Sequence, residues 1–534
     1  MTSRKQTLVL TARTVRHLRA SQVAHRLRLR AQRQIVRRVP VLAAGLLSRQ
    51  VPATPGWPAG FVPVDARLIG HPVDLLAAGR IRLLGQERPL GDWRSTDPPQ
   101  IWRYHLHYWD WAWSLAGDPD RLRGRAVFAR LFAAWQQQTR FGEWDEWSPY
   151  VVSVRAWSWC GQYDALVRGS DREHEFLELL TVHAGYLTAH LELDVGGNHL
   201  IKNLKGLIGL GVFLGDDRLV TRNLRRLERE VARQVLGDGG HAERAPAYHC
   251  QVLADLIDVD GLLGAGSPGW LPAAVERMRR WLGLVLLPDG SVPLLNDGFP
   301  VPPDLVRAVQ PGPPAAEGLT VLPDTGLAVM RRGRGHVLAD FGPPCPDDLP
   351  AHAHADTLGF LLHVGDTRVV SEVGTSTYAP GAVRAAERGT QAHSTVQVDG
   401  ADSTEVWGAF RAARRARASL LSTADDSSGV RVVASHEGYR RLPGAPVHRR
   451  TWVLTADHLT VIDELVGRGE HDVAVRLHGT QPGAVSRSTG PLAEEQASAA
   501  RGWEDRLTAP VLVHRDRVTL PWRFEVEIST KGTA

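Results

Sequence analysis

Cysteine and long apolar runs are both scarce in this chain of 534 residues. Its three cysteines, Cys160, Cys250 and Cys345, are odd in number and widely spaced, which argues against a disulfide framework and permits a reducing compartment. No apolar run approaches the roughly 18 to 20 residues of a membrane-spanning helix. With 43% hydrophobic and 23% charged residues, the composition is that of a soluble globular protein and excludes a disordered chain.

Acidic residues are missing from the first 50 positions, which hold 12 Lys or Arg. The rest of the chain is mildly acidic, with 51 basic against 58 acidic residues. In this N-terminal arm (residues 1–50), Val15, Leu18, Val23 and Leu27 recur at helical spacing and predict an amphipathic basic helix. The helix is expected either to pack on the rest of the chain or to make peripheral contact with a membrane surface. A nucleic-acid partner is not expected, because the basic excess is confined to the arm.

A secretory signal peptide fits the arm poorly, because the apolar stretch "VPVLAAGLLS" would follow a leading region of about forty residues. We therefore expect a cytoplasmic protein. The pair Arg37 and Arg38, shortly before that stretch, leaves twin-arginine export as the alternative.

The chain is too long for one ordinary core, and its sequence pattern changes once along its length. From about residue 60 to 300, apolar residues three and four apart predict helices, among them "RAVFARLFAAWQQQ", "HEFLELLTVHAGYLTAHLEL", "LIKNLKGLIGLGVFLG", "RLVTRNLRRLEREVARQVL" and "AAVERMRRWLGLVLL". Proline and glycine predict a linker without regular structure at 301–318. Beyond it, "HRRTWVLTADHLTVIDELV", "HDVAVRLHG" and "RVTLPWRFEVEIS" predict strands. The predicted fold is a multidomain α+β one, with the arm at 1–50, an (α/α) toroid at 51–310 and an antiparallel β-sandwich at 319–534.

Tryptophan is concentrated early in the chain, since eleven of the seventeen lie between positions 57 and 159. Most are expected to stiffen helix packing, and a minority to stack on sugar rings in a polysaccharide-binding cleft. The candidates for substrate binding in "IWRYHLHYWDWAWS" and "EWDEWSPYVVSVRAWSW" are Trp102, His105, Trp147 and Arg155.

Two polar stretches follow glycine pairs at predicted helix starts. "DVGGNHLIKNLKGL" (194–207) places Asn198 and His199 where backbone N–H groups favour an anion. "GGHAERAPAYHCQVLADL" (239–256) places Glu243, Arg244 and Tyr248 at the start of a later helix, and we take Glu243 and Arg244 as substrate-binding candidates. Each stretch alone is explained by helix capping and packing. Together they predict a polar patch at one end of the helical array.

Three histidines gather in the strand-rich part, in "HAHAD" (352–356) and "QAHST" (391–395). Residues two apart in a strand share a face, so His352 and His354 are expected to point the same way. His354, His393 and an acid, either Asp356 or Glu372, offer the donor atoms that zinc accepts. The alternative is a set of core histidines paired with carboxylates.

Taken in order, these stretches resemble the heparinase II/III-like family of polysaccharide lyases. The resemblance runs from about residue 100 to 480, through "WRYHLHYWDW", "WSPYVVSVR", "GGNHLIKNLKGL", "HAERAPAYHCQVLADL", "PDTGLAVMRRG", "HAHADTLGF", "GTSTY" and "AHSTVQVDG". It implies an (α/α) toroid followed by an antiparallel β-sandwich, and a carbon–oxygen lyase that acts on polysaccharides. The arm and "LHYWDW" look like the branch of the family met beside genes for surface-polysaccharide synthesis, which leaves a biosynthetic or a degradative role open.

The resemblance also implies catalytic roles. It places Tyr248 on the family's catalytic tyrosine, Asn198 and His199 on its Asn-His site, and His352 on a histidine that the β part contributes. The implied reaction is β-elimination in a uronic-acid-containing glycan, in which the C5 proton is removed and the 4-linked oxygen leaves. The implied partner is thus an acidic polysaccharide.

For a metal, the resemblance implies one structural zinc, and it implies no organic cofactor. His354, Glu372 and His393 fall on the three positions that hold zinc in some members of the family. Two positions depart from the family pattern, which usually has Asp where this chain has Glu372 and Asn where it has Ser394.

Two other functions fit the same sequence. A glycoside hydrolase on an (α/α) toroid uses two opposed carboxylates, for which Glu143, Asp145, Glu146, Asp194 and Glu243 are available. A non-catalytic glycan-binding protein of a surface-polysaccharide pathway would keep the cleft without turnover.

Overall fold

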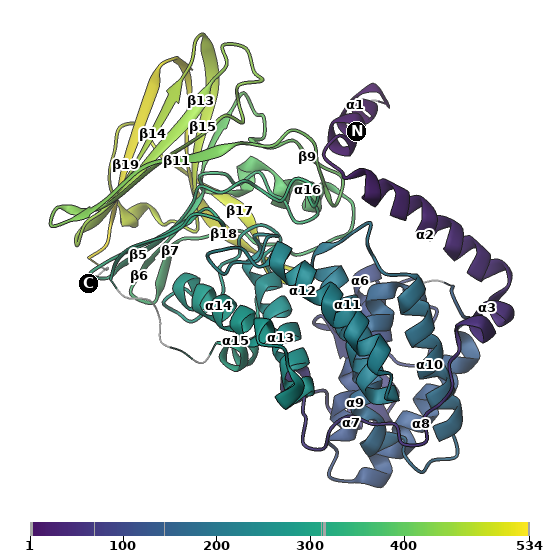
Figure 1. Cartoon of the computed structure of the whole chain (residues 1–534). Helices are drawn as coiled ribbons and strands as arrows, with labels where there is room; N and C mark the ends of the chain where they lie inside the picture. The colour runs from purple at the N-terminus through teal and green to yellow at the C-terminus, as the bar shows by residue number, and fades with distance from the viewer. Residues whose placement is uncertain (1–3, 69, 144, 311, 313–316, 532–534) are drawn as a thin grey trace. The chain divides into compact units, whose positions relative to one another are not determined.

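The computed structural model describes residues 4–531 except positions 69, 144, 311 and 313–316. Contacts divide the chain into two compact units. Figure 1 shows the whole chain, coloured by residue number. The helical unit comprises Arg19–Gln234 and Gln251–Glu276, and the β unit comprises Met1–Leu18, Val235–Cys250 and Arg277–Ala534. The predicted fold class, a helical N-terminal part followed by antiparallel sheets, is confirmed. This division differs from the predicted boundary near 310, because residues 235–250 and 277–310 are part of the β unit. The domain ranges 51–310 and 319–534 stay a prediction.

The five helices that apolar spacing predicts are present, and one of them, α14 (Trp270–Val285), extends from the helical unit into the β unit's range. The helices and one hairpin of the helical unit are α2 (Ala20–Arg38), α3 (Pro40–Leu47), α4 (Val64–Leu68), α5 (Val73–Ala77), β1 (Arg80–Leu83), β2 (Gln86–Pro89), α6 (Gln100–Tyr108), α7 (Trp113–Ala116), α8 (Arg121–Gln138), α9 (Pro149–Leu166), α10 (Glu173–Ala189), α11 (Gly197–Leu214), α12 (Asp217–Gln234), α13 (Pro246–Leu263) and α14 (Trp270–Val285). Helices α13 and α14 run across the sequence boundary between the units.

Glycine fixes both the start and the packing of α11, the helix that carries Asn198 and His199. Gly196 precedes the helix with φ 74°, a conformation that side chains with a Cβ rarely adopt. Further along, a Cβ at Gly206 would lie 3.1 Å from the Ser153 backbone, and one at Gly209 would lie 2.6 Å from the Trp157 ring. Helix α11 therefore packs closely on α9, which holds its N-terminal end in a fixed place within the helical unit.

The β unit is built from antiparallel strands (Figure 1). A five-stranded meander contains β3 (Gly318–Leu322), β4 (Leu327–Arg332), β5 (Gly335–Asp340), β6 (Phe360–Val364) and β7 (Thr367–Val370). A six-stranded sheet has the order β11 (Ala418–Asp426), β12 (Gly429–His436), β13 (Val447–Leu454), β14 (His458–Val466), β19 (Trp522–Ser529), β16 (Val485–Ser488). A four-stranded sheet has the order β17 (Ala493–Gly502), β18 (Asp505–Thr519), β15 (Glu470–His478), β8 (Val396–Val398). The remaining elements are α1 (Arg4–Val15), α15 (Pro303–Val309), α16 (Ala382–Arg388), β9 (Val406–Trp407) and β10 (Arg411–Ala412).

The apolar faces of these sheets share one core, in which strand β14 turns every second residue inward, as its predicted alternation requires. One of those inward residues is Asp463, which accepts two hydrogen bonds from Arg450 at 2.7 and 2.9 Å. Arg450 also donates to the carbonyls of Leu358 and Ser394, both at 2.7 Å. A buried ion pair of the sheet thus anchors the two loops that carry the predicted histidines.

The N-terminal arm departs from the prediction of one helix, because the chain breaks between α1 and α2. The predicted apolar face is exposed, at 46% for Val15 and 62% for Leu27, whereas α2 buries Gln22, Leu29 and Val36. The prediction of one helix was wrong because the spacing of apolar residues was counted across residues 16–19, which separate the two helices. No helix in the described ranges is apolar over enough of its length to cross a bilayer.

Two local predictions are also wrong. The stretch 301–318 contains a helix, α15, since Pro303 occupies its first turn, where the missing N–H of proline costs nothing; positions 311 and 313–316 lie outside the described residues. "HAHAD" is not a strand, because residues 351–359 are irregular and β6 begins only at Phe360. The convergence of its histidines has another cause, described below.

Candidate active site

A pair of tyrosines and a histidine form the centre of a polar cluster in the β unit. Tyr248 lies in the first turn of α13 and is 8% exposed. Its hydroxyl oxygen lies 2.5 Å from that of Tyr378, a hydrogen bond in which either group is able to donate. The ring of Tyr248 also lies 4.0 Å from the ring of His352, measured between centroids. The predicted residues Tyr248 and His352 are therefore neighbours, although they are separated widely in sequence.

His352 is held between two carboxylates. Its Nε2 lies 3.2 Å from Glu243 Oε2, and its Nδ1 lies 2.8 Å from Asp297 Oδ2. Burial lowers the pKa of His352, but Glu243 and Asp297 outweigh this effect and raise the pKa to about 9. His352 is therefore an imidazolium at neutral pH, with its positive charge beside the Tyr248 ring.

Asp297 organises this cluster. Its two oxygens accept from Arg384 at 2.5 and 2.8 Å, and they also bind His352 and His354, each at 2.8 Å. Burial would raise the pKa of Asp297, but Arg384 and the two histidines outweigh it and hold the pKa well below its usual value. One carboxylate thus explains why His352 and His354 converge without a strand. The two anions Glu243 and Asp297 balance the two cations His352 and Arg384.

An aromatic border surrounds the tyrosine pair. Trp503 is half-buried, and its ring lies 4.8 Å from Tyr378 and 5.4 Å from Phe299. The rings of Phe299 and Tyr248 are nearly perpendicular, with 5.7 Å between their centroids. Phe410 is 42% exposed, and its ring centroid lies 5.2 Å from that of Tyr378. These partly exposed rings are of the kind that stack on sugars.

The sequence prediction omitted Asp297, Tyr378, Arg384 and Trp503. Tyr378 ends the quoted motif "GTSTY", and Asp297 follows a residue with positive φ, Asn296, in "NDGFP". An acid beside a turn residue was the available signal for Asp297. Arg384 and Trp503 had no local signal, because a helix arginine and a strand-end tryptophan are ordinary.

The two substrate-binding candidates of this region behave differently. Glu243 is 2% exposed and contacts His352, so it belongs to the cluster. Arg244 has φ 58° and turns its guanidinium to the Thr325 carbonyl. Asn296 donates to the Arg244 carbonyl at 3.0 Å and accepts from the His354 backbone N–H at 3.0 Å. Arg244 therefore supports the loop that carries the histidines.

In the helical unit, Asn198 and His199 lie in the first turn of α11, as predicted. His199 is 36% exposed, and its Nδ1 lies 3.2 Å from Glu192 Oε1. Glu192 also accepts from Asn203 at 3.0 Å. Burial would raise the pKa of Glu192, but His199 and Asn203 outweigh it and lower the pKa. This carboxylate fixes the orientation of the His199 ring, as a base in an active site requires.

The other substrate-binding candidates are mostly interior. Trp102 and Trp147 are 3% and 4% exposed, and Arg155 is fully buried. The Arg155 guanidinium lies 5.6 Å from the Trp147 ring and donates to the carbonyls of His107 and Glu146. His105 is half-buried, and burial lowers its pKa to about 4. Their positions favour packing over contact with a substrate, so a role for them in substrate binding stays a prediction.

The carboxylates that would suit a hydrolase are already engaged or buried. Glu146 has no exposed surface, and burial raises its pKa to about 7 despite the opposing charge of Arg155. The other four acids are paired, Glu143 with Arg94, Asp145 with Arg103, Asp194 with Arg26 and Glu243 with His352.

The predicted zinc donors lie close to His352, because His354 bonds the same carboxylate, Asp297. Four of their buried atoms have no hydrogen-bond partner: His354 Nδ1, Glu372 Oε1, His393 Nε2 and Asp356 Oδ1. The rings of His354 and His393 lie 5.3 Å apart, and Glu372 Oε2 lies 2.5 Å from His393 Nδ1. Burial raises the pKa of both Asp356 and Glu372, so their negative charge is poorly compensated. The donor types fit zinc. Among the described residues, however, no three His, Cys, Asp or Glu side chains have a geometry that would bind a metal ion as they are placed here.

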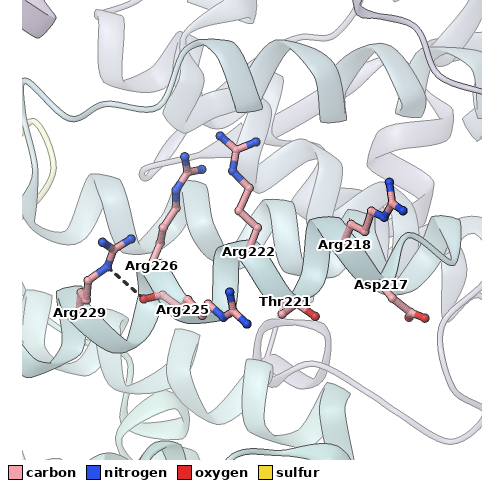
Figure 2. A pocket seen from close by; sticks show the side chains of 7 residues that line it. All are labelled: Asp217, Arg218, Thr221, Arg222, Arg225, Arg226 and Arg229. Atoms are coloured by element: carbon pink, nitrogen blue, oxygen red, sulfur yellow. Dashed lines mark hydrogen bonds between the residues drawn. The ribbon is translucent and has the colours of Figure 1, made fainter.

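An arginine groove runs along α12 in the helical unit. Figure 2 shows its lining, a hollow of about 540 Å³. Its five arginines recur three and four residues apart, so they share one face of the helix over roughly 16 Å; they are Arg218, Arg222, Arg225, Arg226 and Arg229. None of the five forms an ion pair with a carboxylate in the part of the chain that the structure describes. Burial, with the neighbouring charges of Arg222 and Arg229, lowers the pKa of Arg226. The groove suits a polyanion.

Comparison with known proteins identifies the family. Residues 99–310 match the model of the heparinase II/III N-terminus, and residues 314–525 match the model of the heparinase II/III-like C-terminal domain. A crystal structure of heparinase III has a TM-score of 0.72, at 16% identity over 92% of this chain and 90% of that one. A mutant of the heparan sulfate lyase HepC from Pedobacter heparinus has a TM-score of 0.60, at 16% identity over 96% and 89% of the two chains. At such identities these likenesses concern the fold alone.

Among curated proteins, the chain is 29% identical over 410 residues to FtsZ-localized protein C of Caulobacter vibrioides (strain NA1000 / CB15N). The match covers 71% of this chain and 66% of that protein, so the chain spans just under two thirds of its relative. The relative's name states a location and no reaction. From the two family models, which together cover most of the sequence, the chain belongs to the heparinase II/III-like family of polysaccharide lyases.

Proposed function

We propose that this protein is a polysaccharide lyase that cleaves a uronic-acid-containing glycan by β-elimination. The observation that carries the proposal is the Tyr248 phenol in hydrogen-bond contact with Tyr378 and in ring contact with the His352 imidazolium. The family and fold support a glycan substrate. The reaction is our inference from the chemistry that this cluster supports.

The difficulty in β-elimination is the low acidity of the C5 proton beside an ionised carboxylate. Removal of that proton forms an enediolate, which positive charge and hydrogen-bond donors stabilise. The charge of His352 would serve this purpose in the β unit. In the helical unit, the Asn198 amide at the start of α11 has the donor chemistry to bind the same kind of carboxylate.

Tyr248 is the proposed acid, base or both. Burial and Asp297 raise the pKa of Tyr378 well above its usual value, so Tyr378 keeps its proton and is able to donate to the Tyr248 oxygen. That bond and the nearby imidazolium would stabilise a Tyr248 phenolate. The phenolate takes the C5 proton, the C4–C5 double bond forms as the C4–O bond breaks, and the proton passes to the leaving oxygen.

His199 is the proposed base for a substrate of the opposite C5 configuration. Such a proton projects from the other face of the sugar ring, so a second base is needed. Glu192 orients the His199 ring through Nδ1, and Nε2 is the ring atom that we propose transfers the proton. The C5 configuration of the substrate thus decides which of the two bases acts.

We also propose a structural zinc bound by His354, Glu372 and His393. The partnerless atoms His354 Nδ1, Glu372 Oε1 and His393 Nε2 support it, and so does the bond from His354 Nε2 to Asp297. A histidine that binds metal commonly donates its other ring nitrogen to a carboxylate. When bound, the ion would add positive charge and hold these three side chains together, and it takes no part in the proton transfers above.

The arginine groove of α12 is the proposed contact for the acidic chain outside the reacting sugar. Arginine is well suited to this task, because its planar guanidinium binds carboxylate and sulfate groups in a bidentate manner. Contact through several exposed cations makes binding depend strongly on salt.

The decisive experiment is a screen of the purified protein on several uronate polysaccharides, followed by ultraviolet absorbance. β-Elimination leaves a 4,5-unsaturated uronate that absorbs, whereas hydrolysis leaves none. We expect an absorbance increase with at least one substrate. Reducing ends formed without absorbance would assign the protein to the hydrolases.

A non-catalytic glycan-binding role is the second candidate. It is favoured by the curated relative, whose name records localisation with FtsZ and no enzymatic activity. Under this function, the protein would bind an acidic glycan in the same screen without producing new chain ends.

A further inference from the structure

The N-terminal arm has a second apolar surface that the fold leaves uncovered. Helix α2 packs on the helical unit through Gln22, Leu29 and Val36. Val36 lies against Gly142, where an added Cβ would come within 2.1 Å of its side chain. Arg26 adds a bond to Asp194 at 3.3 Å. The buried side of α2 is therefore well defined.

The opposite side of α2 and most of α3 are apolar and exposed. At 100° per residue, Val23, Leu27 and Ile35 lie roughly opposite Leu29, with alanines, a glutamine and, at the last position of the helix, Arg38 near them. Their exposures are 40%, 62% and 59%. The next helix adds exposed apolar side chains at 86%, 62% and 76%, which are Val41, Leu42 and Leu46. These six exposed apolar side chains lie within 24 residues and are here called the arm surface.

Arginines border the arm surface. On the helical wheel, Arg30 and Arg37 lie on one side of the Leu27–Ile35 strip and Arg28 lies on the other. Among the described residues of α2, ion pairing to a carboxylate involves only Arg26. The arm contains no acidic residue that would neutralise the others. The surface therefore combines an apolar strip with uncompensated positive charge.

We propose that the arm surface binds the face of an anionic phospholipid bilayer, with α2 and α3 lying in the interfacial plane. A partner must be apolar and negatively charged at once, and a bilayer surface with anionic headgroups is both. A second copy of the chain fits poorly, because it would bring the same arginines face to face. Membrane attachment of this kind is independent of the proposed lyase activity.

Co-sedimentation of the full-length protein with vesicles tests the proposal. One set of vesicles contains phosphatidylcholine alone, and the other contains phosphatidylcholine mixed with phosphatidylglycerol. We expect sedimentation with the anionic vesicles, weak sedimentation with the neutral ones, and release at high salt. Equal binding to both sets, or to neither, would overturn the proposal.

One triple variant and one double control variant locate the contact. Leu27→Ser, Ile35→Ser and Leu42→Ser together should reduce vesicle binding at least tenfold, with an unchanged melting temperature because all three side chains are exposed. The matched control, Leu421→Ser with Val466→Ser, removes exposed apolar side chains of the β unit and should bind as wild type. If the triple variant instead dissociates a dimer in light scattering and leaves vesicle binding unchanged, the surface is an interface between copies and the proposal is wrong.

Discussion

The ring of His352 lies 4.0 Å from the ring of Tyr248, with 32° between the two planes. A protonated imidazole at this distance favours the ionised form of the phenol. Because Glu243 and Asp297 raise the pKa of His352 to about 9, the charge is present over the neutral range. The positive charge of His352 thereby favours the ionised form of the Tyr248 hydroxyl, the group proposed to transfer the proton.

The pair between Arg384 and Asp297 should be essential for stability. Arg384→Met leaves the fully buried Asp297 carboxylate without its two strongest donors, which typically costs about 3 to 5 kcal/mol. Denaturant unfolding measures this loss. The control Arg431→Met changes an exposed arginine of β12 and should stay within about 0.5 kcal/mol of wild type. A wild-type midpoint for Arg384→Met would contradict the central place given to Asp297.

Zinc is expected to purify with the protein at about one ion per chain, bound by His354, Glu372 and His393. Elemental analysis measures it, and a chelator should lower the melting temperature. His393→Ala should remove the metal, whereas His336→Ala, a buried histidine in β5, should retain it. Metal-free wild-type protein that melts identically with and without chelator would exclude the site.

Glu146 should make the protein less stable as pH rises. Burial raises its folded pKa to about 7, above the 4.5 of an exposed glutamate. Between these values the unfolded state has lost a proton that the folded state keeps, so stability falls through this range and is flat above it. The full difference is about 3 kcal/mol. Glu146→Gln should remove this slope from the melting temperatures of pH 4 to 8, each taken against wild type at the same pH. Parallel curves would show that Glu146 titrates normally.

The arginine groove should contribute salt-dependent affinity. Arg222→Glu with Arg226→Glu reverses two charges of the groove, and binding to an acidic polysaccharide at low salt should weaken at least tenfold with a shallower dependence on salt. Arg431→Glu with Arg487→Glu makes the same change in net charge on exposed strands of the β unit. Equal losses in the two double variants would mean that net charge matters and the groove does not.

The sequence predicted much of the fold because periodicity is a local property. The helix carrying Asn198 began where the glycine pair indicated, and the strand alternation of β14 held even at Asp463. It misplaced the arm helix, because residues 16–19 interrupt a pattern that spacing alone continues. Local patterns do not show which way the chain turns next.

The candidate site was only partly predictable for a related reason. Tyr248, His352 and Glu243 were named in advance, but the carboxylate that joins His352 to His354 comes from Asp297, 55 residues before His352. A single sequence contains no record of such a contact. The tryptophan-rich region agrees with the expectation that most of these residues pack, because the Arg155 guanidinium lies against the rings of Trp135, Trp147 and Trp159.

The most direct test compares wild type with Tyr248→Phe on the same uronate polysaccharide, by the rate of ultraviolet absorbance increase. Loss of the hydroxyl removes the proton-transfer group and the hydrogen bond to Tyr378 but leaves the ring packed on His352. The protein should therefore still fold and melt cooperatively, while the rate falls by about 10² to 10⁴-fold. A Tyr248→Phe protein that generates unsaturated product as fast as wild type would contradict the account.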